Sequence, residues 1–212
     1  MIGIIDYGAG NLQSVKNAIN NIGYEGKLID NAEDARECMG LILPGVGSFA
    51  DAMNTLKQKG WIDEIYRHLD RRKKLMGICL GMQLLFDQGS EGGLTKGLKL
   101  IRGSVDRFNL VNHRVPHVGW NSVCWEKQNH PCIERVKTGI DFYHVHSFIC
   151  MPENEEEVLG TCEYGDRFVT AIASGDIVGF QPQRINHHLD HFIARTGNPG
   201  LQHRVQVFHL FL

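Results

Sequence analysis

The sequence predicts a single α/β domain built on a mixed, largely parallel sheet with helices on both faces. Short apolar runs alternate with amphipathic helical segments in the first half of the chain, which is the pattern of consecutive βαβ units. The second half changes to strands separated by turns, which indicates antiparallel pairing. With 212 residues and 42% hydrophobic composition, the chain has the size and make-up of one globular domain.

The bulk composition excludes several functional classes. A formal net charge of -2 gives no sign of a nucleic-acid or membrane-surface partner. The N-terminus lacks a basic segment, and no stretch is long enough to cross a bilayer. Six cysteines without any C-x-x-C pair argue against structural zinc and fit a reducing compartment. We therefore expect a cytoplasmic protein with no metal and no cofactor.

The first half is expected to alternate strands with helices. Asn11 is placed to cap the first helix and Gly23 to follow its end. The glycine-rich turn before that helix lacks the third glycine of the G-x-G-x-x-G fingerprint, since Gln13 stands there, so no nucleotide site is expected. The expected strands are residues 2–6, 26–29, 40–43 and 75–78, and the expected helices are residues 12–22, 32–38, 48–60 and 61–72.

Residues 77–81 read Gly-Ile-Cys-Leu-Gly between a strand and a helix-forming segment, which is the pattern of a nucleophile elbow. Gly77 and Gly81 leave room for strand and helix to approach closely. Cys79 is expected to be exposed at the tip of the turn, above a helix start that favours the thiolate. The N–H of Leu80 would point to where an oxyanion forms. The alternative is a buried core cysteine, but a core strand gains nothing from two glycines.

The loop at residues 44–48 reads Pro-Gly-Val-Gly-Ser and follows the strand at 40–43. Ligands of open α/β sheets bind at such carboxyl ends of parallel strands. Its glycines allow backbone N–H groups to turn toward a substrate, so Val46 or Gly47 is a candidate second oxyanion donor. A turn without chemistry is the alternative for this loop taken alone.

The second half is expected to contain strands at residues 98–108, 117–125, 141–150 and within 160–181, with turns at 164–166 and 174–176. His144 and His146 fall on one face of the third of these strands. No third ligand stands at a useful spacing, so we interpret them as packed or surface histidines rather than as a metal site.

Five ordered segments resemble the glutaminase subunits of imidazole glycerol phosphate synthase, within the class I glutamine amidotransferases. They are residues 6–12, 44–47, 77–83, 116–121 and 144–147. The resemblance runs from residue 1 to about residue 181 and implies the fold of that family. It also implies the reaction, in which a thiolate attacks the side-chain amide of glutamine, ammonia leaves and the thioester is hydrolysed. The ammonia passes to a (β/α)8-barrel cyclase, with which the glutaminase forms a heterodimer for histidine biosynthesis.

The resemblance also implies roles for individual residues. Cys79 is the nucleophile, and the N–H groups of Leu80 and Val46 are the oxyanion donors. Residues resembling positions around the bound glutamine are Gly47, Gln83, His146 and Ser147. Residues resembling the surface that faces the cyclase are Asn11, Pro116, His117, Gly119, Trp120 and Asn121.

The chain departs from the family after residue 181. The family places Phe-His-Pro-Glu there, and the ungapped alignment puts Gln183 at the histidine position and Ile185 at the glutamate position. Glutamine does not titrate and isoleucine cannot orient an imidazole, so the family's general base is missing. The sequence therefore predicts an impaired glutaminase, unless His187 or His188 supplies a substitute base.

Residues 182–212 also differ in composition, because they contain no Lys and no Glu but five of the eleven histidines. We interpret residues 1–181 as the amidotransferase domain and 182–212 as a divergent tail of that domain. A reading-frame change would explain the tail, and resequencing of the gene would reject it if the neighbouring frame does not encode Phe-His-Pro-Glu. Two other functions stay open: a non-catalytic partner-binding subunit, and a glutaminase that serves a surface-sugar amidotransferase.

Overall fold

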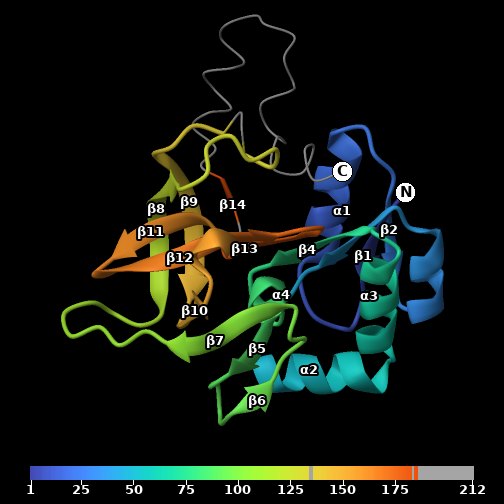
Figure 1. Ribbon diagram of the computed structural model, residues 1–212, viewed down its shortest axis with the longest axis horizontal. Coiled ribbons are helices and arrows are strands. Elements are labelled where there is room, and N and C mark those ends of the chain that lie inside the picture. The colour runs from blue at the N-terminus through green and yellow to red at the C-terminus, as the bar shows by residue number, and fades with distance from the viewer. Residues whose placement is uncertain (134–135, 183, 186–212) are drawn as a thin grey trace, which may run out of the picture.

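The computed structural model describes residues 1–133, 136–182 and 184–185. These residues form a fourteen-stranded mixed sheet (Figure 1). Five neighbouring strands make its parallel part, and every pair among them is parallel. In spatial order they are β2 (Gly26–Ile29), β1 (Ile2–Ile5), β3 (Gly40–Leu43), β4 (Lys74–Ile78) and β13 (Ile177–Phe180).

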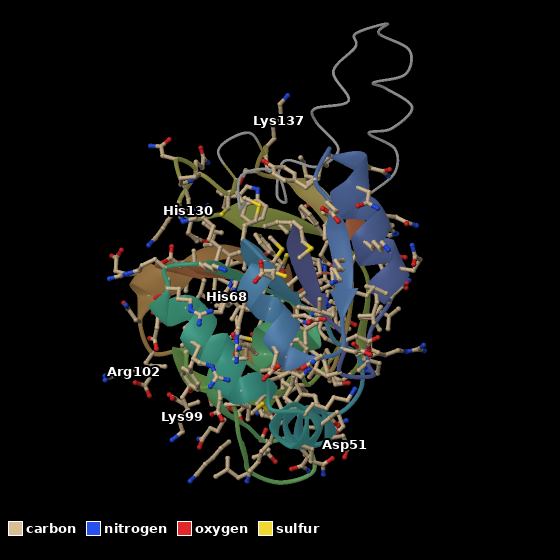
Figure 2. All side chains as sticks on the ribbon, turned by 90° about the vertical axis from the view of Figure 1, so that its right-hand side faces the viewer. Asp51, His68, Lys99, Arg102, His130 and Lys137 are labelled. Atoms are coloured by element: carbon tan, nitrogen blue, oxygen red, sulfur yellow. The ribbon has the colours of Figure 1, made fainter. Side chains whose placement is uncertain are left out.

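Helices cover both faces of the parallel part, as predicted. On one face, Ile19 of α1 (Leu12–Asn21) packs in a cluster with Ile4 and Ile42. On the other face, Leu41 and Leu43 pack against helices, because successive strand residues point to opposite faces. Those helices are η1 (Ala32–Glu37), α2 (Phe49–Gln58) and α3 (Trp61–Asp70). Figure 2 shows His68 of α3 within the outline of the fold, whereas Asp51 and Lys99 lie at the surface.

The second half is mostly antiparallel, as predicted, although β13 pairs in parallel with β4, and Ile101–Arg107 pairs in parallel with Phe86–Gly89. Strand β12 (Asp166–Ser174) joins the two parts because it pairs antiparallel with β13. The elements of this half are β7 (Ile101–Arg107), β8 (His117–Trp125), β9 (Ile140–His146), β10 (Phe148–Pro152), η2 (Glu155–Glu157), β11 (Val158–Tyr164), β12 (Asp166–Ser174) and β14 (Arg184–Ile185).

Two expected elements differ from the structure. The single strand predicted at residues 141–150 is two strands, because β9 pairs with β8 whereas β10 pairs with β7, and the chain changes partner at Ser147. The helix after Cys79 is only the single turn α4 (Leu80–Gln83), followed by β5 (Phe86–Gly89) and β6 (Thr95–Lys96). The carbonyls of Leu84 and Leu85 accept N–H groups from residues 98 and 100, which draws the backbone out of the helix.

No helix among the described residues is long and apolar enough to cross a membrane.

Candidate active site

Cys79 stands between β4 and α4 with φ 55° and ψ −114°. A residue other than glycine is strained at positive φ, and such strain is typical of functional turns. The two glycines are required by space: a Cβ on Gly77 would lie 2.6 Å from the carbonyl oxygen of Gly81, and a Cβ on Gly81 would overlap the carbonyl oxygen of Leu43. The predicted strand and sharp turn are therefore confirmed, and the helix is the single turn α4.

The exposure predicted for Cys79 is wrong, because only 8% of the residue is accessible. The loop after β3 lies against the elbow, where a Cβ on Gly45 would be 3.0 Å from the Cβ of Leu80. The hydroxyl of Tyr7 donates to the carbonyl oxygen of Pro44 at 3.0 Å and fixes this loop. Val46 follows in the same loop and is 50% exposed, and Gly47 has φ 99°. The structure thus brings the two predicted sources of oxyanion N–H groups into one neighbourhood.

Burial sets the protonation of the groups beside the elbow. Burial raises the pKa of Tyr7 above its ordinary value, and the charge of Cys79 raises it further. Burial followed by the charge of Cys79 likewise raises the pKa of Cys150 well above its ordinary value. Both neighbours therefore keep their protons at neutral pH, and neither can act as a base toward the thiol.

A chain of side-chain amides leads to the sulfur. Gln83 donates from Nε2 to the carbonyl oxygen of Phe148 at 3.3 Å and to Oε1 of Gln181 at 3.1 Å. Gln181 in turn donates from Nε2 to Sγ of Cys79 at 3.6 Å. Gln181 was not among the site residues predicted from the sequence. Its position directly after β13 was the available signal, since β13 lies beside β4 and parallel strands end at the same edge.

The structure brings one more predicted pocket residue into this network. His146 is 6% exposed, and its Nδ1 donates to the same Phe148 carbonyl at 2.9 Å. Gln83 and His146 therefore meet at one backbone oxygen. Ser147 lies half-buried where β9 ends and β10 begins.

The comparisons with known proteins agree with this geometry. The sequence matches the family described as "Glutamine amidotransferase class-I" over residues 3–182. The chain belongs to the class I glutamine amidotransferases.

Individual relatives and a solved structure are similar to most of this chain. The chain is 44% identical over 208 residues to the "Imidazole glycerol phosphate synthase subunit HisH" of Moorella thermoacetica, covering 94% of this chain and 98% of that protein. The protein of that name from Desulfitobacterium hafniense (strain DSM 10664 / DCB-2) is 42% identical over 188 residues, covering 87% of each. A structure titled "Crystal structure of glutamine amidotransferase" has a TM-score of 0.67 and 18% identity, covering 93% of this chain and 99% of that one. At that identity the structural likeness shows the fold alone.

In this amidotransferase the histidines predicted to be packed are indeed packed. His144 and His146 are joined by His117, and all three are buried around Phe108 and Phe168. Burial lowers the pKa of His144 to about 3 and that of His146 to about 4, and it also lowers that of His117. The described residues hold no group of three or more His, Cys, Asp or Glu side chains that could bind a metal ion.

Every ring nitrogen of this histidine cluster is engaged. His144 Nδ1 donates to the carbonyl of Phe142 at 3.0 Å, and its Nε2 lies 2.8 Å from Oγ1 of Thr170. His117 Nδ1 lies 3.2 Å from Nε2 of His146, and His117 Nε2 lies 2.7 Å from Oδ1 of Asn121. None of the three histidines therefore offers a ring nitrogen to Cys79.

The residues predicted to face the cyclase do not share one face of β8. Trp120 is 44% exposed, whereas His117 is wholly buried. The reason is the two-residue period of a strand, which turns His117, Gly119 and Asn121 away from the face that carries Trp120. Pro116 is exposed just before the strand, and Asn11 is exposed at the start of α1, where it caps the helix through Ser14 N as predicted.

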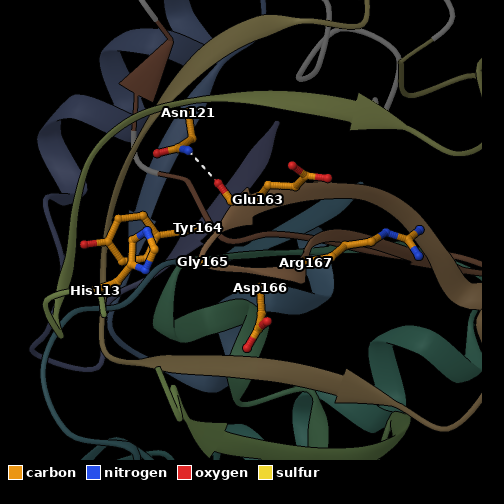
Figure 3. A pocket seen from close by; sticks show the side chains of 7 residues that line it. All are labelled: His113, Asn121, Glu163, Tyr164, Gly165, Asp166 and Arg167. Atoms are coloured by element: carbon orange, nitrogen blue, oxygen red, sulfur yellow. Dashed lines mark hydrogen bonds between the residues drawn. The ribbon is translucent and has the colours of Figure 1, made fainter. Parts of the chain in front are cut away.

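A cavity of about 670 Å³ opens beside the turn between β11 and β12 (Figure 3). Asn121 Nδ2 donates to the carbonyl oxygen of Glu163 at its edge. No residue of the elbow lines it, so it is separate from Cys79. Its lining residues are His113, Asn121, Glu163, Tyr164, Gly165, Asp166 and Arg167.

The predicted base positions are only partly described. Gln183, His187 and His188 lie outside the described residues. The backbone of Ile185 belongs to β14, where it pairs with Phe142 of β9. The absence of the family's histidine and glutamate from these positions is a fact of the sequence, and its consequence for activity stays a prediction.

Proposed function

We propose that this class I glutamine amidotransferase hydrolyses glutamine to glutamate and ammonia and supplies the ammonia to the cyclase of imidazole glycerol phosphate synthase, in histidine biosynthesis. The strained backbone of Cys79 in a glycine-flanked elbow is the observation that carries the proposal. The names of the relatives support the choice of pathway. The heterodimer with a (β/α)8-barrel cyclase and a cytoplasmic location follow from the same proposal.

The chemistry assigned to the site is acyl transfer through a thioester. The Cys79 thiolate attacks the amide carbon of glutamine, the C–N bond breaks, and the leaving nitrogen takes a proton and departs as ammonia. Water then cleaves the thioester to give glutamate and regenerates the thiol. The N–H groups of Leu80 and Val46 hold the oxyanion in both steps, while Gly47, Gln83, His146 and Ser147 surround the substrate.

We further propose that this chain performs the reaction slowly. Proton transfer to the leaving nitrogen needs a general acid, and such catalysis contributes roughly 100- to 10,000-fold. Gln183 and Ile185 stand at the family's histidine and glutamate positions, and the histidines of β8 and β9 bond elsewhere. We assign residues 1–181 to the amidotransferase domain and 182–212 to a divergent tail of it.

The partner surface is proposed to be the exposed side of β8 and β9. Val118 is 55% exposed and pairs with Val145, and Trp120 pairs with Tyr143. Half-exposed aromatic residues on such a face are typical of interface anchors. Pro116, Gly119 and Asn121 would border it, and His117 would support it from below. Asn11, at the start of α1, is proposed as a further contact with the cyclase.

Glutamate release from glutamine by the purified chain, with and without a cyclase subunit, tests the proposal. In the chain without the cyclase, we expect a slow reaction that the Cys79→Ala change abolishes and that the Cys124→Ala change, at an exposed position of β8, leaves intact. The double change Gln183→His/Ile185→Glu is expected to raise the rate by about 100-fold or more.

A silent double variant that still binds the cyclase would reject glutamine hydrolysis and favour the non-catalytic partner-binding subunit. Binding to a sugar amidotransferase instead of the cyclase would reject the histidine pathway.

A further inference from the structure

Gln181 directly follows β13, which lies beside β4, the strand that ends just before Cys79. The N–H of Cys79 donates to the carbonyl oxygen of Phe180 at 2.7 Å, and the N–H of Gln181 donates to that of Thr170 at 2.8 Å. The residue is 1% exposed, so its amide must find its partners inside the protein. Among the described residues, its side-chain amide bonds to Gln83 and Cys79.

The carbonyl oxygen of Phe148 determines which atom donates in each hydrogen bond from Gln83 to Cys79. The carbonyl oxygen of Phe148 can only accept, so Gln83 must present its Nε2 there. The second N–H of that same nitrogen faces Gln181, which must therefore present its Oε1 to Gln83. The amide of Gln181 is then left with Nε2 toward the sulfur of Cys79. The network thus makes the sulfur an acceptor.

We propose that Gln181 is a catalytic residue of this amidotransferase, which stabilises the Cys79 thiolate by donating a hydrogen bond to it. Gln83 is its positioning residue, because it fixes which end of the Gln181 amide faces the sulfur. A donor to the charged form of an acid favours that form, and the thiolate is the nucleophile. This inference rests on the proposed function only in taking Cys79 as the nucleophile.

A donor of this kind separates two steps that a histidine performs together. The amide of Gln181 raises the fraction of thiolate, but it does not titrate and cannot pass a proton to the leaving nitrogen. The thiolate should therefore react readily with an electrophile whose leaving group needs no proton. Iodoacetamide is such a probe, since the sulfur attacks its methylene carbon, a C–S bond forms, and the C–I bond breaks to release iodide.

The experiment measures the rate of iodoacetamide alkylation of each cysteine against pH, by mass spectrometry of digested samples. Gln181→Met removes the donor at similar side-chain size, and Gln181→Glu replaces it with an acceptor. Gln88→Met is the matched control, because Gln88 is exposed on β5. Cys124 is exposed, whereas Cys132 and Cys162 are buried and report any unfolding in the same samples.

We expect Gln181→Met to slow alkylation of Cys79 at pH 7 by about tenfold and to move its pH midpoint upward by about one unit, as loss of a hydrogen bond to a charged group implies. Gln181→Glu should slow it further, and Gln88→Met should leave it unchanged. If Gln181→Met unfolds the chain, alkylation of Cys132 and Cys162 shows it, and the isosteric Gln181→Glu decides.

Unchanged alkylation of Cys79 in a folded Gln181 variant would overturn the inference, whatever the rate of glutamine hydrolysis. A different result would reject the proposed function. In that case Cys79 alkylation depends on Gln181, but the Gln183→His/Ile185→Glu variant releases no glutamate.

Discussion

The Cys79 elbow and the buried histidine cluster of β8 and β9 belong to the same sheet, but their backbone conformations differ. Cys79 has φ 55° and is flanked by glycines at which an added Cβ would overlap backbone atoms. His117, His144 and His146 lie in paired strands, and their ring nitrogens are bonded to neighbours. The difference teaches that backbone strain, and not a cluster of titratable side chains, distinguishes the proposed active site from the rest of the sheet.

The largest effect is expected where the elbow is most crowded. A Cβ added by Gly81→Ala would overlap the carbonyl oxygen of Leu43 in the next strand. Backbone atoms on both sides must move, so we expect a loss of about 3 kcal/mol in the free energy of unfolding. Chemical denaturation of the purified variant measures it.

Gly119→Ala is the matched control, because Gly119 lies in β8 beside the histidine cluster and nothing stands within 4 Å of its added Cβ. We expect this variant to gain about 0.5–1 kcal/mol in the free energy of unfolding, because alanine is favoured over glycine inside a strand. Equal losses in the two variants would remove the contrast between the crowded elbow and the ordinary strand.

The sequence was sufficient to predict the elbow and the parallel half of the sheet, because both depend on local patterns. Gly77, Cys79 and Gly81 stand at fixed spacing, and four of the five parallel strands, β1 to β4, each precede a helical segment. The fifth, β13, was expected only among the strands of the second half, and its parallel pairing with β4 comes from contacts between distant segments. The position of His144 and His146 on one face of the strand also follows from the two-residue period of a strand.

The remaining parts of the site depend on contacts between distant segments. Gln181 reaches Cys79 across 102 positions of the chain, and Gln83 reaches Gln181 across 98. The single turn of α4 is set by the pairing of residues 84 and 85 with residues 98 and 100, which no local propensity encodes. The same holds for the burial of Cys79, a side chain that its own turn would expose.

The histidine cluster should appear in the pH dependence of stability. His144 has its pKa lowered to about 3 by burial, whereas a histidine in the unfolded chain titrates near 6.5. Below that value the unfolded state binds a proton that the folded state does not, so stability is full above pH 6.5 and falls as the pH decreases toward 3. Between pH 7.5 and pH 5, His144 should contribute a loss of about 2 kcal/mol.

The measurement compares the wild-type protein with His144→Gln by denaturation at both pH values. The other two histidines of the cluster are present in both proteins, so their contributions cancel in the difference. His113→Gln, at an exposed histidine, should keep the wild-type dependence. A His144→Gln variant that loses as much stability as the wild type on acidification would show that this histidine is not held neutral by the fold.

The smallest effect is expected from relieving the strain at Cys79 itself. Glycine adopts positive φ freely whereas alanine does not, so Cys79→Gly should be more stable than Cys79→Ala by about 1 kcal/mol. The same pair of substitutions at Cys124, in the regular strand β8, should give the opposite order, because glycine weakens a strand by roughly 0.5–1 kcal/mol relative to alanine. Thermal unfolding of the four variants measures both differences. A shared order at the two positions would mean that the elbow stores no strain, and the contrast with the histidine strands would then lie in their side-chain bonds alone.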